Sequence, residues 1–240
     1  MGNSTVGLAV WEPGAEGPVA VEQLSDATEA GTRVAGRRAA VISVAPTRLA
    51  AFLATAGPGA VVVDRPAIPL AASSLAETTG ADRFAVVTAA LPGPAVCVDA
   101  GTAVTVDVLD RDGVYRGGFI GAGPATMRAG LAQRAEALPE GGGEAVPLEP
   151  GLDTANALAA GSWGMCVGGV DRLVSEAIES LAPSRGELVA VLVTGGWGEA
   201  YLEASRRPRD HAEVSISFDP HLVHRGIRAW ARRRWARPGS

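Results

Sequence analysis

The chain has 240 residues, of which 47% are hydrophobic and 20% charged, a composition that fits a folded globular protein and excludes extensive disorder. Its formal net charge of −5 argues against a dedicated nucleic-acid-binding protein. All 21 basic residues are arginine, so a Walker-type phosphate loop and a lysine Schiff base are excluded. The two cysteines fit no metal-binding spacing, and the sequence shows neither a signal peptide nor a membrane-spanning run. We therefore expect a cytoplasmic protein with no membrane contact.

Short apolar runs alternate with helical patterns through the first part of the chain. Strands are expected at 6–11, 39–43 and 60–64, and helices at 46–56 and 79–91. Pro46 suits the first turn of its helix, where a missing N–H costs nothing.

The alternation continues to the end of the chain. Strands are expected at 95–99, 103–109, 114–120 and 188–193, and helices at 124–138 and 154–181. Asp112-Gly113 is a strong hairpin signal between two of these strands. Thr154 is expected to cap the long helix, and a last helix is expected to begin with Asp219 as its cap and Pro220 at its first position. Alternating strands and helices indicate the α/β class.

One internal similarity suggests a duplicated architecture. Residues 2–10 read GNSTVGLAV and residues 101–109 read GTAVTVDVL, each a glycine, a small polar residue and then a strand. The spacing of about 100 residues is too long for a solenoid repeat. We therefore expect two similar halves, residues 1–92 and residues 93–240.

The segment VCVDAGTA, residues 96–103, is a candidate phosphate loop. A buried strand carries Asp99 to its end, Gly101 allows a tight turn, and Thr102 offers a hydroxyl and an amide. Backbone N–H groups in such a turn can form an anion-binding concavity, beside which a carboxylate can hold a cation. The alternative interpretation is a plain hairpin turn whose aspartate bonds to its own loop.

Three other segments carry polar or glycine-rich chemistry. In GADR, residues 80–83, Asp82 could accept a hydroxyl proton and Arg83 could bind a carboxylate or phosphate, although an aspartate is also favoured at any helix start. Thr194-Gly195-Gly196 follows a buried strand, where open α/β sheets bind ligands, and the glycine-rich run 117–123 resembles a phosphate loop. Generic turns explain both glycine segments equally well.

The C-terminal region carries two further features. His221 and His224 share a helix face, but no third ligand accompanies them, so a metal site is not favoured. Arginines are interleaved with Trp230 and Trp235 in the tail, which could touch nucleic acid or an acidic partner. A solvated helix end anchored by two aromatic residues is the favoured interpretation.

Taken in order, these motifs resemble the type III pantothenate kinases, a family of the actin, sugar kinase and Hsp70 superfamily. The resemblance rests on VISVAP at 41–46, GADR at 80–83, VDAGTAVTVDV at 98–108, GVYRGGFIGAG at 113–123, GLAQRAEALP at 130–139, DTANALAAG at 153–161 and the strand with TGG at 188–196. It implies two ribonuclease H-like halves with mixed sheets flanked by helices. It also implies that ATP phosphorylates pantothenate to 4'-phosphopantothenate, the first step of coenzyme A biosynthesis.

The resemblance assigns roles to particular residues. Asp82 matches the general base, and Gly80, Ala81, Asp82, Arg83 and Thr154 match the pantothenate contacts. Asn3, Ser4 and Thr102 match ATP contacts, and Asp99 matches the residue that binds a monovalent cation, K⁺ or NH₄⁺. The implied partners are ATP with Mg²⁺, pantothenate and a second copy of the chain in a homodimer.

The sequence departs from the family pattern in two places. An aspartate-bearing strand is expected before Gly2-Asn3-Ser4, by analogy with residues 96–100, and we expect the true start to lie upstream. The family usually has a tyrosine a few residues before GADR, where Ser73 stands here. Two alternatives follow: a non-catalytic, regulatory relative of the transcriptional accessory type with a degraded first phosphate loop, or a kinase with another small hydroxy-acid or sugar acceptor.

Overall fold

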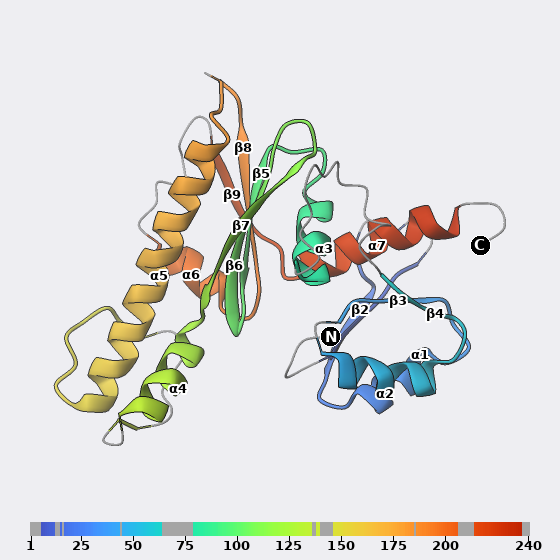
Figure 1. Cartoon of the computed structure of the whole chain (residues 1–240), viewed down its shortest axis with the longest axis horizontal. Helices are drawn as coiled ribbons and strands as arrows, with labels where there is room; N and C mark the ends of the chain where they lie inside the picture. Colours follow the sequence, from blue (N-terminus) through green and yellow to red (C-terminus); the bar gives the residue numbers. More distant parts are fainter. Residues whose placement is uncertain are drawn as a thin grey trace. The chain divides into compact units, whose positions relative to one another are not determined.

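The computed structural model describes residues 6–12, 15, 17–43, 45–63, 79–135, 138–139, 146–184, 186–205 and 214–236. The chain groups into two compact units (Figure 1): unit 1 comprises Met1–Ala89 and His221–Ser240, and unit 2 comprises Ala90–Pro220. Asn3, Ser4 and Ser73, which the sequence analysis singled out, lie outside the described residues.

Unit 1 contains two short, separate sheets in its described residues. Its elements are β1 (Val6–Val10), β2 (Ala20–Leu24), α1 (Ala27–Val34), β3 (Ala39–Val41), α2 (Pro46–Ala56), β4 (Ala60–Val62), α3 (Ala81–Ala89) and α7 (Leu222–Trp235). β1 and β2 form an antiparallel pair, and β3 and β4 form a parallel pair.

Local sequence signals fix the helices that pack beside these strands. The Asp26 carboxylate caps α1 by accepting a hydrogen bond of 2.7 Å from the Glu29 amide, and Pro46 opens α2. The two helices approach closely, because a Cβ at Gly31 would lie 2.4 Å from the Phe52 carbonyl oxygen. Together with β1 and β3 they bury a small apolar core that includes Val6 and Phe52.

The last helix packs within unit 1. A Cβ at Gly226 of α7 would lie 1.8 Å from the carbonyl oxygen of Ala85 in α3, so only glycine permits this helix crossing. The predicted half 93–240 includes this helix, whereas its packing groups it with residues 1–89. The predicted start at Asp219-Pro220 is wrong, because the helix begins at Leu222. The Asp219 amide instead donates to the Val193 carbonyl oxygen at 2.8 Å and extends the strand before it.

Unit 2 is built on one continuous mixed sheet. Its strands are β5 (Ala95–Ala100), β6 (Ala103–Leu109), β7 (Tyr115–Ala122), β8 (Val189–Thr194) and β9 (Val214–Phe218), in the order β7-β6-β5-β8-β9. β6 is antiparallel to β5 and β7, whereas β8 is parallel to β5 and β9. β5 is therefore the central strand, and five of its six residues are buried.

Among the residues described in unit 2, three helices are present: α4 (Pro124–Arg134), α5 (Thr154–Ser180) and α6 (Gly198–Ala204). Alternate residues of the strands, such as Val96 and Val98, point into a core that α5 and α6 cover from one side of the sheet (Figure 1). The two helices are joined through Asp171 of α5, whose carboxylate accepts hydrogen bonds from the Tyr201 and Ser205 hydroxyls at 2.8 and 2.7 Å.

Both cysteines lie in unit 2 and are buried. Cys97 is in the middle of β5, where burial and the nearby Asp107 carboxylate raise the pKa of its thiol well above the ordinary range. Burial also raises the pKa of the Cys166 thiol, on α5, to about 11. Within the described residues, no helix combines the length and hydropathy needed to span a membrane.

The α/β class with mixed β-structure is confirmed, and every strand and helix that the sequence predicts is present. The prediction omitted four elements, β2, α1, α6 and β9. It also carried the helix after Gly123 too far, because the structure ends α4 at Arg134. Thr154 is not the cap of α5; that role belongs to Asp153, whose carboxylate accepts a hydrogen bond of 2.8 Å from the Asn156 amide.

Candidate functional site

The candidate site is centred on the turn that joins the central strand β5 to β6 in unit 2. Asp99 is the penultimate residue of β5, and Gly101 and Thr102 form the turn. The neighbouring parallel strand β8 ends at Thr194, which is the register partner of Asp99. The carboxyl ends of two parallel strands therefore meet here, which is where open α/β sheets bind ligands.

A second loop, Thr194-Gly195-Gly196-Trp197, packs directly on this turn. Gly195 has a φ of +94°, and a Cβ there would lie 2.5 Å from the backbone of Ala100. The Trp197 amide donates to the Ala100 carbonyl oxygen at 3.2 Å, and its indole Nε1 donates to the Gly101 carbonyl oxygen at 2.8 Å. Gly195 therefore serves loop packing, whereas a Cβ at Gly196 would meet no atom within 4 Å.

A third segment, the start of α4, also binds the turn. The Gly123 amide and the Thr126 hydroxyl both donate to the Thr102 carbonyl oxygen, at 2.9 and 2.6 Å. A Cβ at Gly123 would lie 2.4 Å from the Gly101 carbonyl oxygen, so glycine is required for this approach. The positive end of the α4 dipole consequently lies next to the turn.

These contacts use up the carbonyl oxygens of the turn. The carbonyl oxygens of Ala100, Gly101 and Thr102 all accept hydrogen bonds from unit 2 itself. The amide and the hydroxyl of Thr102 take no part in those bonds, and Thr102 is exposed. The Gly101 amide is also used within the turn, where it donates to the Ala103 carbonyl oxygen at 3.2 Å. The Thr102 amide and hydroxyl are therefore the candidate donors of this turn to an anion such as a phosphate.

Asp99 is half-buried beside this turn. A Cβ at Gly101 would lie 3.7 Å from Asp99 Oδ1, so the carboxylate reaches the turn itself. In the part of the chain that the structure describes, no group of three or more His, Cys, Asp or Glu side chains could hold a metal ion. Asp99 is the carboxylate at this turn, and one carboxylate does not supply the several oxygen ligands that a divalent ion held by protein carboxylates needs.

The GADR segment lies in unit 1. Asp82 and Arg83 occupy the first turn of α3, and Gly80 directly precedes that helix. One carboxylate oxygen of Asp82 accepts a hydrogen bond of 2.9 Å from the Arg83 amide. This bond joins two neighbouring residues of the first turn, so it differs from the bond that a capping side chain accepts from the second or third helical amide.

Thr154 lies in unit 2 as the first residue of α5, and it is exposed. The neighbouring Asp153 has a lowered pKa, first because its carboxylate accepts the Asn156 amide hydrogen bond and second because it accepts one from the Asn156 side chain. The structure thus brings Asp99, Thr102 and the Thr194 loop together in unit 2, whereas Gly80–Arg83 belong to unit 1.

The sequence analysis missed two residues of the site, Trp197 and Thr126. The side chains of both donate hydrogen bonds to carbonyl oxygens of the turn, and neither residue belongs to a spacing pattern that the sequence displays. The signals that could have found them are their positions: Trp197 directly follows the Gly195-Gly196 pair, and Thr126 lies in the first turn of the helix after Gly123.

The fold and these loops define an α/β protein with a candidate ligand site at the carboxyl edge of a mixed sheet. A family model described as type III pantothenate kinase matches residues 1–176. The chain therefore belongs to the type III pantothenate kinase family.

Individual relatives agree with this assignment over part of their length. A type III pantothenate kinase of Stenotrophomonas maltophilia (strain K279a) is 37% identical over 159 residues, which cover 65% of this chain and 59% of that protein. A second type III pantothenate kinase, from Xanthomonas euvesicatoria pv. vesicatoria (strain 85-10), is 38% identical over 153 residues, which cover 63% of this chain and 57% of that protein. The chain thus matches less than two thirds of the length of these curated relatives.

A solved structure shares the fold over nearly the whole chain. It is a Campylobacter jejuni protein described as a Baf family transcriptional activator, with a TM-score of 0.64 and 20% sequence identity, and the match covers 97% of this chain and 96% of that one.

Proposed function

We propose that this chain transfers a phosphoryl group from ATP to pantothenate, giving 4'-phosphopantothenate and ADP, the first step of coenzyme A biosynthesis. The observation that carries the proposal is the β5–β6 turn, whose carbonyl oxygens accept hydrogen bonds from Trp197 and Thr126 while Thr102 is exposed and the Asp99 carboxylate lies beside the turn. Membership of the type III pantothenate kinase family supports the reaction.

The turn supplies the phosphate end of the reaction. The Thr102 amide and hydroxyl hold the ATP phosphates, with Asn3 and Ser4 as further ATP contacts from the first loop. The Asp99 carboxylate holds K⁺ or NH₄⁺, and Mg²⁺ accompanies ATP. These cations offset the negative charge that spreads over the transferring phosphoryl group.

The GADR segment supplies the acceptor end. Asp82 accepts the proton of the terminal hydroxyl of pantothenate while that oxygen bonds to the γ-phosphorus. The bond from the γ-phosphorus to the bridging oxygen breaks, and its electron pair leaves with ADP. Arg83 binds the pantothenate carboxylate through its guanidinium, and Gly80, Ala81 and Thr154 line the same substrate. This chemistry needs positioning and one modest base, and it needs no lysine.

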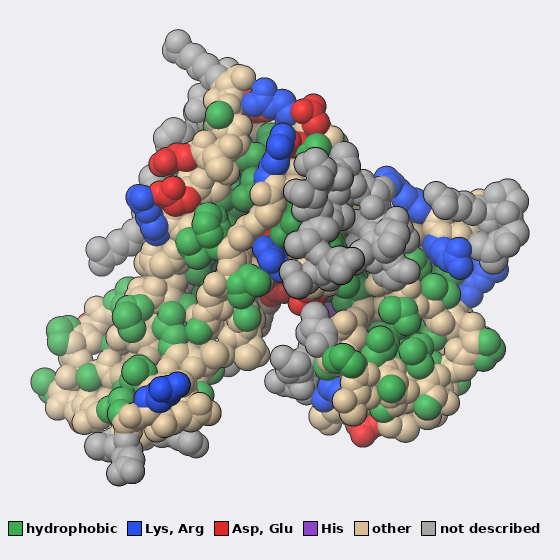
Figure 2. Space-filling model, in the orientation of Figure 1, with side chains coloured by type: hydrophobic (Ala, Val, Ile, Leu, Met, Phe, Trp, Pro, Cys, Tyr) green, Lys and Arg blue, Asp and Glu red, His purple; other side chains and the backbone are tan. Residues whose placement is uncertain are grey.

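We also infer that the chain works in the cytoplasm as a homodimer. Exposed apolar side chains gather on β7, α4 and α5 of unit 2, where Ile120 is 65% and Met165 61% exposed, and Figure 2 shows apolar side chains on that part of the unit. Such a patch marks an interaction surface. We further infer that both units are ribonuclease H-like halves, which the shared order of their strands and helices supports.

The test is ADP release by the purified chain with ATP and Mg²⁺, with and without pantothenate, in potassium and in sodium buffer. We expect pantothenate-dependent release that falls in sodium. Asp82→Asn and Asp99→Asn should each lower kcat by about 100-fold or more. Asp112→Asn is the matched control, because it neutralises an exposed aspartate in a hairpin turn. Circular dichroism should show all three variants folded.

The alternative is a non-catalytic, regulatory relative, which the description of the Campylobacter jejuni neighbour motivates. That function predicts nucleotide binding at most and no phosphoryl transfer. No ADP release under any condition, with ATP binding intact by calorimetry, would favour it. Release with another hydroxy-acid or sugar, and none with pantothenate, would keep the kinase and change its acceptor.

A further inference from the structure

The charges of the chain are divided unequally between its two units. Unit 1 holds 12 arginines against 8 acidic residues, a net charge of +4, whereas unit 2 holds 9 arginines against 18 acidic residues, a net charge of −9. An anionic partner is attracted by the local charge of a surface. The net charge of the whole chain therefore does not exclude such a partner from unit 1.

The basic charge of unit 1 is concentrated on α7. Residues 221–240 contain six arginines and no acidic residue, and Figure 2 shows basic side chains near the C-terminal end of α7. Arg225, Arg228 and Arg232 recur at intervals of three and four residues, so they form a row on one face of the helix, which Trp235 continues. The buried residues of α7 lie on its other sides; they are Leu222, Gly226, Trp230 and Ala231. The row therefore belongs to the side of α7 that does not pack into unit 1.

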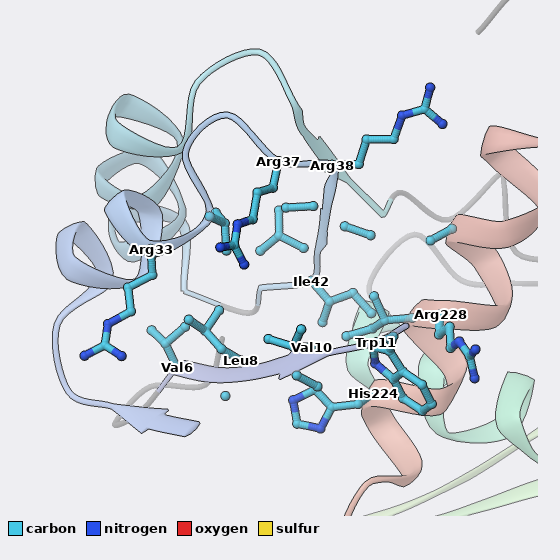
Figure 3. Close-up of a pocket in the computed structure, with 18 of the residues that line it drawn as sticks. Val6, Leu8, Val10, Trp11, Arg33, Arg37, Arg38, Ile42, His224 and Arg228 are labelled. Atoms are coloured by element: carbon cyan, nitrogen blue, oxygen red, sulfur yellow. The ribbon is translucent and has the colours of Figure 1, made fainter. Parts of the chain in front are cut away.

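Two indole rings border this row of arginines. The Arg228 guanidinium lies 4.0 Å from the Trp11 ring centroid (Figure 3), and the Arg38 guanidinium lies 6.0 Å from the Trp235 ring centroid. Both indoles are half-buried. Arg37 directly precedes Arg38 in the chain and is exposed. The end of the row therefore combines further guanidinium groups with an aromatic ring.

Salt bridges do not neutralise this surface in the part of the chain that the structure describes. No carboxylate there pairs with Arg38, Arg232 or Arg233. The arginines also repel one another: burial lowers the pKa of Arg228, and the charges of Arg232 and Arg225 lower it further. An anion bound along the row would relieve this repulsion.

The stability of the helix does not account for the row. A helix dipole favours cations in the last turn, where Arg232 lies, and disfavours them in the first turn. Arg225 is the fourth residue of α7, so it completes the disfavoured turn. Like charges four residues apart, here Arg228 and Arg232, also destabilise a helix. Side chains that oppose the local preferences of an element are expected where they serve binding.

We propose that α7 binds single-stranded nucleic acid, with phosphates on Arg225, Arg228 and Arg232 and a base stacked on the Trp235 indole. The planar guanidinium binds phosphate through two hydrogen bonds, and an indole stacks on a base of any sequence. The three arginines span about 10 Å at 1.5 Å per residue, which accommodates about three phosphates at the 3.4 Å spacing of a stacked strand. This inference stands apart from the proposed kinase activity.

Other anionic partners match the surface less well. An acidic peptide pairs with guanidinium groups but has no flat base for the indole. An anionic membrane takes up a basic helix by burying its apolar side, and the apolar side of α7 is already buried in unit 1.

The experiment measures the fluorescence anisotropy of fluorescein-labelled dT15 titrated with the full chain from about 50 to 200 mM salt, a range over which phosphate contacts weaken strongly. The test variant is Arg225→Gln with Arg232→Gln, two exposed members of the row. The matched control is Arg134→Gln with Arg172→Gln, which removes two exposed helical arginines of unit 2. Glutamine keeps the helix propensity of arginine in all four positions. Circular dichroism checks that both variants are folded.

We expect the unaltered chain to bind dT15 and the test variant to bind it about tenfold or more weakly. Each lost phosphate contact lowers the slope of log K against log salt by about 0.7, so the slope should fall by about 1.4 in the test variant and stay unchanged in the control. Trp235→Leu should weaken binding by about fivefold or more and leave the slope unchanged, because stacking releases no counterions.

Three results would overturn the proposal. The first is no binding of dT15 at the lowest salt, and the second is equal loss of binding in the test and control variants. The third is binding of a 15-residue polyglutamate peptide or of phosphatidylserine vesicles at least as tight as that of dT15, which would identify a surface for acidic peptides or for membranes. ATP and pantothenate are omitted throughout, so failure of the kinase proposal is a separate result.

Discussion

The two units organise the same kinds of elements around very different sheets. In unit 2 the central strand β5 pairs with the antiparallel β6 on one side and the parallel β8 on the other within one five-stranded sheet, and its residues are almost completely buried. In unit 1 the four described strands form two separate pairs, and β2 has no buried residue. In unit 2, β5 makes the sheet continuous because it pairs with both β6 and β8.

The two units also differ in the kind of contact that holds their segments together. The loops of unit 2 are held together by hydrogen bonds between segments far apart in sequence, such as Trp197 to Gly101. In unit 1, glycine permits close approach between helices at Gly31 and Gly226. We expect unit 1 to depend on helix packing and unit 2 on the continuity of its sheet.

The largest expected effect tests the helix packing of unit 1. Gly226→Ala places a Cβ 1.8 Å from the Ala85 carbonyl oxygen, so α3 and α7 must separate. We expect a loss of about 3 kcal/mol in the free energy of unfolding of unit 1, measured by denaturant titration followed at α3 and α7 by hydrogen exchange.

The matched control is the same substitution in an open helix of unit 2. Gly168 of α5 is exposed, and a Cβ there meets nothing within 4 Å, so Gly168→Ala should stabilise unit 2 by about 0.5–1 kcal/mol. Changes of the same sign in the free energy of unfolding of Gly226→Ala and Gly168→Ala would contradict this difference between the units.

A smaller effect is expected at the hairpin of unit 2. The Asp110 carboxylate accepts hydrogen bonds from the amides of Asp112 and Val114, each at 2.9 Å, and from Arg116 at 2.6 Å. Burial alone would raise the pKa of Asp110, but these three bonds outweigh it and lower the pKa below its ordinary value. Asp110→Asn should cost about 1–3 kcal/mol at neutral pH.

The lowered pKa of Asp110 also predicts how the stability loss of Asp110→Asn depends on pH. Because the folded pKa is lowered, the contribution of Asp110 is fully present above the ordinary carboxyl pKa of about 3.9 and is lost as pH falls through the folded pKa. Thermal unfolding of the two proteins should therefore differ at pH 7 and converge in strong acid. A difference that persists unchanged at low pH would contradict the assignment.

The smallest expected effect concerns the site. Trp197→Phe removes the hydrogen bond from Nε1 to the Gly101 carbonyl oxygen, which should cost about 1 kcal/mol of unit 2 stability. Under the proposed function it should also raise KM for ATP more than it lowers kcat. Trp163→Phe is the control. The Trp163 ring centroid lies 5.8 Å from that of Trp197 in the same core, and its substitution leaves the hydrogen bond from Trp197 to the Gly101 carbonyl oxygen in place. Equal KM values for ATP in the two variants would contradict a role of Trp197 in the site.

The sequence predicted the elements with strong apolar patterns and missed those without one. β5 and β8 are buried runs of small apolar residues, and the periodicity of α5 is evident along its length. β2, with the sequence AVEQL, has largely exposed side chains, so it shows no apolar run. The start of α7 was misplaced because the strand-like hydrogen bond of Asp219 is a tertiary contact that local propensity does not encode.

The candidate site was predictable to the same extent. Asp99 and Thr102 stand in a local motif, so the sequence identified them and the structure places them on one turn. The contacts that hold this turn come from residues 24 and 96 positions away, Thr126 and Trp197, and a single sequence carries no signal for such pairings. The roles of Asp82, Arg83 and Thr154 stay predictions.

The burial of both thiols has a practical consequence for work on the two units. Cys97 and Cys166 are the two cysteines of the chain, and both belong to unit 2. Because burial raises the pKa of each, a thiolate-directed reagent at neutral pH reacts with them when unit 2 opens. Pulsed alkylation read by mass spectrometry therefore reports the opening of unit 2 alone, and local opening of unit 1 leaves no label on the intact protein.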